Sequence, residues 1–484
     1  MAYKSQRQFI ELLEKSGELK RISYPVSPEL EITEIATRVM HSGGPALLFE
    51  NVKGSGMPVS INLMGSSRRM ALALGVEDVE EIARRIESLF STKIPESLLG
   101  KLALLPRLRD LTRYPPRIVS SGPVQEIIEE GDEVDLGKIP VLTCWPADGG
   151  PYFTLPQVIT RSPETEMRNV GMYRMQVFDR RTTGMHWHIH KHGAQHFEQA
   201  RKRGERLEVA VAFGGDPALT YAATAPLPET VEEYLFAGFL RQEPVELIKA
   251  HTVSLDVPAE ADLVLEGYID PDEPLRSEGP FGDHTGYYSL EDDYPVFHVT
   301  AVTRRKDAIY PATVVGPPPM EDYWMGHATE RIFRPLLRLV VPELVDYHMP
   351  PEGVFHNLVF VSIRKRYPGQ AYKVMHSLWG QGLMMLAKVL VVVDEDVDVQ
   401  NPAEAWWAAL NNIDPQRDTI FTPGPADTLD HASSLQHYGT KMGIDGTRKL
   451  PSEGFTRPWP DKIQMTEEVR RKVDMIWKEL GIDG

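Results

Sequence analysis

Hydrophobic side chains recur at helical spacing near the N terminus, where Phe9, Ile10, Leu12 and Leu13 fall within one short segment. Apolar runs typical of buried strands alternate with such helical segments through the first hundred residues. The predicted helices are 5–16, 31–41, 67–75 and 78–90, and the predicted strands are 19–22, 46–49 and 59–63. We therefore expect an N-terminal α/β domain, residues 1–115. Because no Gly-rich phosphate loop joins a strand to a helix there, this domain is predicted to be structural.

Short strands dominate the chain after an Arg- and Pro-rich stretch centred on Pro115-Pro116. The predicted strands are 153–161, 168–179, 184–190, 207–213, 263–269, 296–304 and 308–315, with helices near 194–203 and 229–241. Many short strands with few helices indicate a barrel or a sandwich. This pattern predicts a central domain, residues 116–316.

The α/β pattern returns beyond Pro317-Pro318-Pro319, which predicts a C-terminal domain, residues 320–484. The run Val389–Val393 is continuously apolar, as in a strand covered on both faces. The other predicted elements are helices at 327–340, 370–386 and 403–411 and a strand at 357–363, followed by a tail of turns. The last helix, capped by Thr466, has an apolar stripe that must pack on its own chain or on a partner subunit. The stripe consists of Val469, Val473, Ile476, Trp477 and Leu480.

Composition narrows the class of protein. The 484 residues are 42% hydrophobic and 25% charged, as in ordinary soluble globular proteins. The net charge of -17 and the lack of a Lys/Arg-rich tract argue against nucleic-acid binding. The single cysteine, Cys144, excludes an intrachain disulfide and indicates a reducing compartment. Without a signal-like N terminus or an apolar run of about 18 residues, we expect a cytoplasmic protein with no transmembrane segment.

Candidate chemistry begins with Glu278 and Asp283, which lie five residues apart and are separated by glycines and a proline, so a shaped turn must hold them. Phe281, Tyr287 and Tyr288 are expected to form apolar walls that desolvate a carboxyl group. Desolvation raises a carboxyl pKa, as a general acid near neutral pH requires. Taken alone, the composition also fits an acidic surface turn.

Four histidines alternate within residues 185–192, so on a strand they would share one face. One interpretation is a solvated polar face. A second is a zinc hydrolase, because His-x-His is common at zinc sites. Lys191-His192 stands where such an enzyme needs an Asp-His pair, which weakens this interpretation. The third is an anion pocket in which the histidines and Lys191 neutralise a phosphate.

Two further candidates depend on their local structure. Asn169 and Arg174 have opposite strand parity, so one of them must lie at a bulge or a strand end for both to face one site. Glu233 lies three residues after Thr230, so it can complete a capping box at a helix start. The alternative for Glu233 is ligation of a hard metal ion.

The loop from Glu278 to Tyr288 resembles the active-site loop of the UbiD family of prenylated-flavin decarboxylases, especially the bacterial 4-hydroxy-3-polyprenylbenzoate decarboxylases. The resemblance covers nearly the whole chain. Its other motifs are Gly17–Ile22, Leu30–Ala36, Gly43–Asn51, Thr143–Pro146 and Lys441–Gly443. The chain departs from those bacterial enzymes in its histidine-rich segment and at His196, where they have an acidic residue.

The resemblance implies a set of site residues. Arg174, Glu278 and Asp283 match the catalytic trio of the family. Asn169, His196 and Glu233 match ligands of a divalent metal, usually Mn²⁺ with K⁺ nearby, that bridges to the cofactor phosphate; this mixed, oxygen-rich set suits such a metal. The cofactor-binding positions fall on Asn169, Met172, Tyr173, Arg174, His186, Trp187, His188, Lys191 and His192.

The resemblance also implies a fold and an activity. The expected fold is α+β and multidomain, with an N-terminal α/β domain, a central split β-barrel for prenylated FMN and a C-terminal α/β oligomerisation domain. The implied reaction is reversible, non-oxidative decarboxylation of an aromatic or α,β-unsaturated acid, with a hydroxybenzoate of quinone biosynthesis favoured. A homodimer or homohexamer is expected, with a separate flavin prenyltransferase as supplier of the cofactor.

Alternatives to this function remain open at the level of sequence. The changed histidine segment leaves room for a catabolic phenolic or heteroaromatic acid as substrate. A metal-dependent hydrolase built on the histidines of 186–196 would need no flavin. A non-catalytic flavin-binding scaffold would leave Glu278 replaceable. Within the favoured mechanism, Asp283 is expected to raise the pKa of Glu278 by like-charge repulsion and to hold Arg174.

Overall fold

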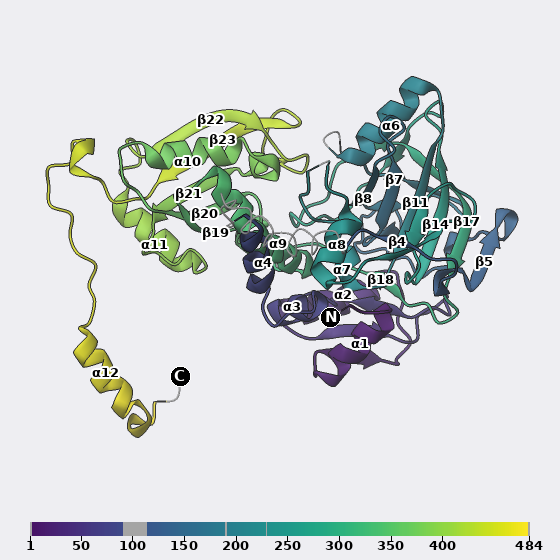
Figure 1. Ribbon diagram of the computed structural model, residues 1–484, viewed down its shortest axis with the longest axis horizontal. Coiled ribbons are helices and arrows are strands. Elements are labelled where there is room, and N and C mark those ends of the chain that lie inside the picture. Colours follow the sequence, from purple (N-terminus) through teal and green to yellow (C-terminus); the bar gives the residue numbers. More distant parts are fainter. Residues whose placement is uncertain (1, 91–113, 189–190, 229, 483–484) are drawn as a thin grey trace, which may run out of the picture.

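The computed structural model describes residues 2–90, 114–188, 191–228 and 230–482. Three groups of elements follow one another along the chain, and the long helix α9 lies where the central and C-terminal groups meet (Figure 1). Most predicted elements are present with bounds within a few residues of those expected.

The N-terminal group follows the predicted order of helices and strands. Its elements are α1 Gln6–Lys15, β1 Leu19–Ile22, α2 Glu31–His41, β2 Ala46–Phe49, β3 Val59–Ile61, α3 Ser67–Ala73 and α4 Glu80–Phe90. Its sheet has the order β1-β2-β3-β18, and the last of these strands, β18 (Tyr310–Ala312), pairs parallel with β3. A segment more than 240 residues away in the sequence therefore completes this sheet, with Tyr310 opposite Val59.

The central group is built on a seven-stranded sheet of order β10-β17-β14-β11-β7-β8, with β5 paired to β17. Its strands are β5 Ile127–Glu130, β7 Gln157–Arg161, β8 Arg168–Met172, β10 Thr182–Gly184, β11 Leu207–Phe213, β14 Leu263–Ile269 and β17 Val296–Arg304. The helices are α6 His192–Arg203, α7 Pro217–Ala222 and α8 Glu233–Arg241. Three smaller sheets accompany the seven-stranded sheet. One contains β4 Arg117–Ile118, β12 Glu246–Lys249 and β13 Asp256–Pro258. The other two are the pairs β6 Tyr152–Phe153 with β9 Met175–Gln176 and β15 Arg276–Glu278 with β16 Asp292–Tyr294.

The C-terminal group contains a five-stranded sheet of order β19-β20-β21-β23-β22. Its elements are α9 Glu321–Val340, β19 Leu344–His348, β20 Leu358–Ile363, α10 Gln370–Trp379, β21 Val389–Asp394, α11 Pro402–Asn412, β22 Thr419–Pro425, β23 Tyr438–Asp445 and α12 Glu467–Ile476. Strand β21 confirms the expected two-sided burial. Leu390 and Val392 belong to one hydrophobic cluster, whereas Val391 and Val393 belong to another.

Several predictions about elements are wrong. The single strand predicted at 153–161 is two strands, β6 and β7, and the helix predicted at 370–386 ends as α10 at Trp379. The expected strand 184–190 coincides with β10 only at Gly184, residues 185–188 have no regular structure, and 189–190 lie outside the described residues. The single strand predicted at 168–179 is two strands, β8 and β9. The predicted tail of turns contains β22 and β23, whose Gly- and Pro-containing sequences hide an antiparallel pair that only its packing stabilises.

The last helix confirms the predicted cap, because the Thr466 side chain accepts a hydrogen bond from the backbone N–H of Val469. Its apolar stripe, however, is largely exposed in this chain, with Trp477 and Leu480 each 48% accessible. Figure 1 shows α12 standing apart from the other elements at the end of an extended segment.

Among the described residues, no helix combines the length and the apolar character that crossing a membrane requires.

Candidate active site

The loop after β15 is held in a defined shape by side chains from other parts of the central group. Gly279 adopts a φ of 108°, which side chains rarely tolerate. Its N–H donates to Gln176 Oε1 at 2.9 Å, and the N–H of Gly282 donates to Asp148 Oδ1 at 2.8 Å. A Cβ at Gly282 would lie 2.1 Å from Trp145, so the loop approaches that ring as closely as a glycine allows.

Arg174 lies between β8 and β9, outside both strands, which agrees with the expected break in strand parity. Its Nε donates to Glu278 Oε1 at 3.0 Å, and its other nitrogens contact Asp283 Oδ2 and, at 3.2 Å, Ser289 Oγ. The guanidinium also lies 4.7 Å from the centre of the Phe281 ring. The structure therefore brings the three predicted catalytic residues into one buried cluster.

The pKa of Glu278 moves in the direction opposite to the prediction. Burial favours a higher pKa, but the hydrogen bond from His186 and the positive charge of Arg174 outweigh it and lower the pKa to about 2. Asp283 does not raise the pKa of Glu278, because Arg174 pairs with both carboxylates and offsets their repulsion. The expected aromatic walls are also only partly present, since Phe281 is buried whereas Tyr287 and Tyr288 are 63% and 44% exposed.

A second chain of contacts leads from Asp283 to the C-terminal group. Asp283 Oδ1 lies 2.9 Å from His284 Nδ1, and His284 Nε2 lies 2.9 Å from His356 Nε2. Burial opposes protonation of His284, but its hydrogen bond to Asp283 prevails and raises its pKa to about 9. Burial and the neighbouring His284 lower the pKa of His356 to about 4. His284, whose side chain is 20% exposed, is therefore a partly buried cation at neutral pH that pairs with Asp283.

The segment carrying the predicted histidines starts at the cluster of Arg174, Glu278 and Asp283. His186 Nδ1 lies 2.9 Å from Glu278 Oε2, and its Nε2 lies 2.7 Å from His188 Nε2. Burial, followed by the adjacent His186, lowers the pKa of His188 to about 3, so this pair is neutral at physiological pH. The alternating pattern predicted a strand with these histidines on one face, but the described residues 185–188 do not form a strand.

The same segment ends beside the predicted metal ligands. His192, the first residue of α6, has Nδ1 3.2 Å from Asn169 Oδ1. His196 Nδ1 lies 2.9 Å from Thr160 Oγ1, and Thr160 is the residue directly opposite Asn169 in the β7–β8 pair. Glu233 Oε2 accepts from the N–H of Val170 at 2.9 Å, so all three predicted ligands approach one stretch of β8.

Glu233 does not cap its helix. Helix α8 begins at Glu233 itself, with Glu232 as N-cap residue and no side-chain capping bond, so the expected capping box with Thr230 is wrong. Burial raises the pKa of Glu233 to about 7, and the Nδ2 of Asn169 is buried without a hydrogen-bond partner. A divalent cation suits the raised pKa of Glu233, because it favours the ionised carboxylate and takes carboxylate and amide oxygens as ligands. The Nδ2 of Asn169 is a donor, so only the Oδ1 of that side chain could ligate the cation.

The remaining predicted cofactor positions surround this segment. Tyr173 and Trp187 are buried, with ring centroids 6.3 Å apart, and Met172 packs at the edge of the larger core cluster. Lys191 precedes α6, and burial lowers its pKa. A helix N terminus beside a partly buried lysine is a favourable site for an anion such as a phosphate.

The sequence did not reveal several residues that shape the site. Asp148, Gln176 and Ser289 hold the loop or Arg174, and His356 reaches it from the C-terminal group. Asp148 begins an Asp-Gly-Gly turn directly after the motif Thr143–Pro146, which was a usable signal. The others have no local signature, because their contacts join distant segments.

Comparison with known proteins identifies the class that this fold and site define. Residues 10–87, 117–318 and 323–446 match the N-terminal, Rift-related and C-terminal domains of 3-octaprenyl-4-hydroxybenzoate carboxy-lyase. The chain belongs to this carboxy-lyase family, the UbiD family, and it is an enzyme of the decarboxylase type. The predictions of family and enzyme class are therefore confirmed.

Particular relatives cover almost the whole chain. An uncharacterized protein of Aquifex aeolicus is 52% identical over 483 residues, 99% of each chain. The structure of vanillic acid decarboxylase from Sedimentibacter hydroxybenzoicus in closed form is 30% identical, with a TM-score of 0.86 over 99% of this chain and 100% of that one. The UbiD-class enzyme HmfF from Pelotomaculum thermopropionicum, in complex with FMN, is 31% identical, with a TM-score of 0.79 over 94% of this chain and 97% of that one.

Proposed function

We propose that this enzyme catalyses reversible, non-oxidative decarboxylation of an aromatic or α,β-unsaturated carboxylic acid with prenylated FMN. The observation that supports it best is the segment 186–192, which contacts Glu278 at one end and Asn169 at the other. The proposed catalytic residues therefore lie beside His186, and the proposed cation ligand Asn169 lies beside His192, six residues later in the chain, which suits an elongated flavin cofactor. A hydroxybenzoate of quinone biosynthesis is the favoured substrate, and a catabolic phenolic or heteroaromatic acid is the alternative.

The cofactor is needed because carbon dioxide leaves an sp² carbon with an electron pair that no amino-acid side chain can accept. When bound, prenylated FMN supplies the electron sink. The chain's own tasks are to orient the substrate carboxylate, exclude water and return a proton to carbon.

Arg174 and Glu278 divide these tasks in the proposal. The fork geometry of a guanidinium suits a substrate carboxylate. A carboxylate that binds Arg174 competes with Glu278 for the same positive charge, and the pKa of Glu278 then rises. Glu278 is therefore ionised before substrate binds and becomes a better proton carrier afterwards, while Asp283 keeps Arg174 in place.

The metal proposal rests on Asn169, His196 and Glu233 as ligands of Mn²⁺, with K⁺ nearby. We expect Glu233→Gln to lose most bound manganese and to weaken FMN binding, because the charged ligand is removed at unchanged volume. Metal analysis and flavin absorbance of the purified variant measure both effects. Glu232→Gln is the matched control, since Arg168 already engages that carboxylate. Unchanged manganese in Glu233→Gln would contradict the ligand assignment.

Finer features belong to the same proposal. They are a split β-barrel arrangement of the central strands, the domain limits 1–115, 116–316 and 320–484, and a separate flavin prenyltransferase as cofactor supplier. A homodimer or homohexamer is also included, because the exposed stripe of α12 would gain burial on a second copy of the chain. A monomeric mass in sedimentation equilibrium would contradict the oligomer.

Activity tests this function directly. Enzyme produced together with a flavin prenyltransferase should exchange a ring or vinyl proton of its product for solvent deuterium, across a panel of hydroxybenzoic, other phenolic and heteroaromatic acids. Enzyme produced without it should fold and remain inactive until prenylated FMN is supplied. Full activity in flavin-free protein would instead favour the hydrolase alternative. Against that alternative, the described histidines of 186–196 form no group of three or more His, Cys, Asp or Glu ligands.

A further inference from the structure

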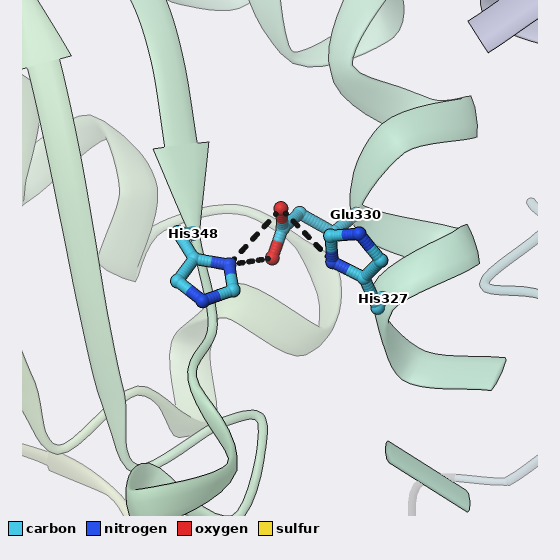
Figure 2. A group of neighbouring side chains, drawn as sticks. All are labelled: His327, Glu330 and His348. Atoms are coloured by element: carbon cyan, nitrogen blue, oxygen red, sulfur yellow. Dashed lines mark hydrogen bonds and ion pairs between the residues drawn. The ribbon is translucent and has the colours of Figure 1, made fainter. Parts of the chain in front are cut away.

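A buried cluster outside the proposed active site joins α9 to β19. His327 and Glu330 lie one turn apart on α9, which places them on the same helix face. His348 is the last residue of β19, and both imidazole rings turn their Nδ1 atoms toward the Glu330 carboxylate (Figure 2). Glu330 is fully buried, His348 is nearly so, and the His327 side chain is 21% exposed.

The distances within the cluster fit ligands of one small metal ion. His348 Nδ1 lies 3.0 Å from Glu330 Oε2, and His327 Nδ1 lies 3.5 Å from Glu330 Oε1. Tetrahedral ligands placed about 2.0–2.2 Å from a zinc ion are roughly 3.3–3.6 Å from one another. All three ligand atoms lie within 4.8 Å of one another, so side-chain movements of about an ångström would bring them around such an ion.

Hydrogen bonding alone does not satisfy this cluster. A carboxylate offers about four lone-pair positions. Three donors outside the cluster contact Glu330, namely the N–H of Met349 at 2.7 Å, Arg331 at 3.2 Å and Gln400 at 3.1 Å. His348 Nδ1 takes the remaining position with a hydrogen bond at 3.0 Å, so no capacity is left for His327, whose Nδ1 is buried without a hydrogen-bond partner. A metal ion would use one carboxylate lone pair and take both ring nitrogens as ligands.

The charges around the cluster leave room for a cation. Arg331 and Arg334 each pair with both Glu80, on α4, and Asp346, on β19. Together with Glu330, this network has three carboxylates and two guanidinium groups. With neutral histidines it carries one uncompensated negative charge, which is costly in a buried place. Either a metal ion or an extra proton on a histidine can compensate that charge.

We propose that His327, Glu330 and His348 bind a first-row divalent transition-metal ion of the zinc class. Two imidazoles and one carboxylate are a ligand set that zinc and its neighbours accept, with water completing the coordination. The partly exposed His327 provides access for the ion. The ion would join α9 to β19 within the C-terminal group, and the pairs of Arg331 and Arg334 with Glu80 extend the network to α4.

Cobalt binding tests the proposal in full-length protein. Glu233→Gln serves as the parent, so that ions at the proposed cofactor site do not obscure this one. After removal of metals with a chelator, the parent should bind cobalt with visible absorption bands typical of nitrogen ligands. Adding His327→Gln should lower cobalt affinity at least about tenfold, as loss of a ligand does, whereas adding His376→Gln, an exposed histidine on α10, should not.

These measurements distinguish a bound metal ion from an extra proton on a histidine of the cluster. Circular dichroism confirms that each protein is folded, and His327→Gln is preferred over His348→Gln because His327 is the less buried ligand. Zinc added to the parent should also raise its Tm, and this rise should disappear in His327→Gln. Equal cobalt binding with and without His327, or no binding by the parent, would overturn the proposal. Since the histidine variants leave the active site untouched, this result is independent of the proposed function.

Discussion

Glu278→Gln is expected to lower turnover and solvent-deuterium exchange into the product by a factor of roughly 10² to 10⁴, the usual contribution of a positioned acid. The amide keeps the volume of the side chain and can still accept from Arg174, but it cannot transfer a proton. Substrate and flavin binding should change little, because Arg174 remains to orient a carboxylate. Stopped-flow turnover and mass spectrometry of the product in deuterated solvent measure the effect.

Two companion variants make this result specific. Asp283→Asn should cause a smaller loss, because Asp283 positions Arg174 and His284 rather than carrying the proton. Glu291→Gln, an exposed acid on the same loop, should behave like wild type. Exchange in Glu278→Gln within tenfold of wild type would mean that the proton comes from another group.

Arg174→Gln is expected to abolish measurable turnover and to destabilise the protein by ~3–5 kcal/mol at neutral pH, the cost of leaving buried carboxylates without their cation. Glu278 is completely inaccessible, and the Asp283 side chain is 11% exposed, so water cannot replace the guanidinium. Thermal unfolding followed by circular dichroism measures the loss. Arg276→Gln is the control, because this exposed arginine stacks on Phe178 instead of pairing within the site.

The pH dependence of this variant follows from the lowered pKa of Glu278. In wild type, a pKa of about 2 against an ordinary 4.5 means that Glu278 stabilises the fold fully above pH 4.5. This contribution is lost as the pH falls toward 2, and is ~3 kcal/mol in size. Without Arg174 the pKa rises, and acid then neutralises an unpaired carboxylate. The Tm difference between the two proteins should therefore narrow between pH 7 and pH 4, and a constant difference would contradict the proposed ion cluster.

Two residues of the C-terminal group contact the loop that carries Glu278 and Asp283. His356 meets His284, and Tyr287 of the catalytic loop lies 4.5 Å from the ring of His431. These residues follow α9 in the chain, whereas the catalytic trio precedes it. Residues of the C-terminal group therefore contact the predicted catalytic loop directly.

The sequence by itself determined the elements whose stability is local. Helical periodicity predicted α1, α2 and the capped α12, and the continuous apolar run predicted the doubly covered β21, because burial patterns and caps act over a few residues. The motif in the loop 278–288 also indicated the family, and it gave Glu278 and Asp283 as candidate catalytic carboxylates. These helices, this strand and this loop motif depend on residues that are neighbours in the sequence, so their positions along the chain could be predicted.

Only the tertiary structure decided features that depend on distant neighbours. The pKa of Glu278 is lowered rather than raised, because Arg174, 104 residues earlier, and His186, 92 residues earlier, approach it in space. Glu233 faces β8 instead of capping its own helix, and β18 joins a sheet formed mainly by the first 61 residues. Electrostatic energy and strand pairing depend on distance in space, and sequence spacing alone does not specify which remote groups will meet.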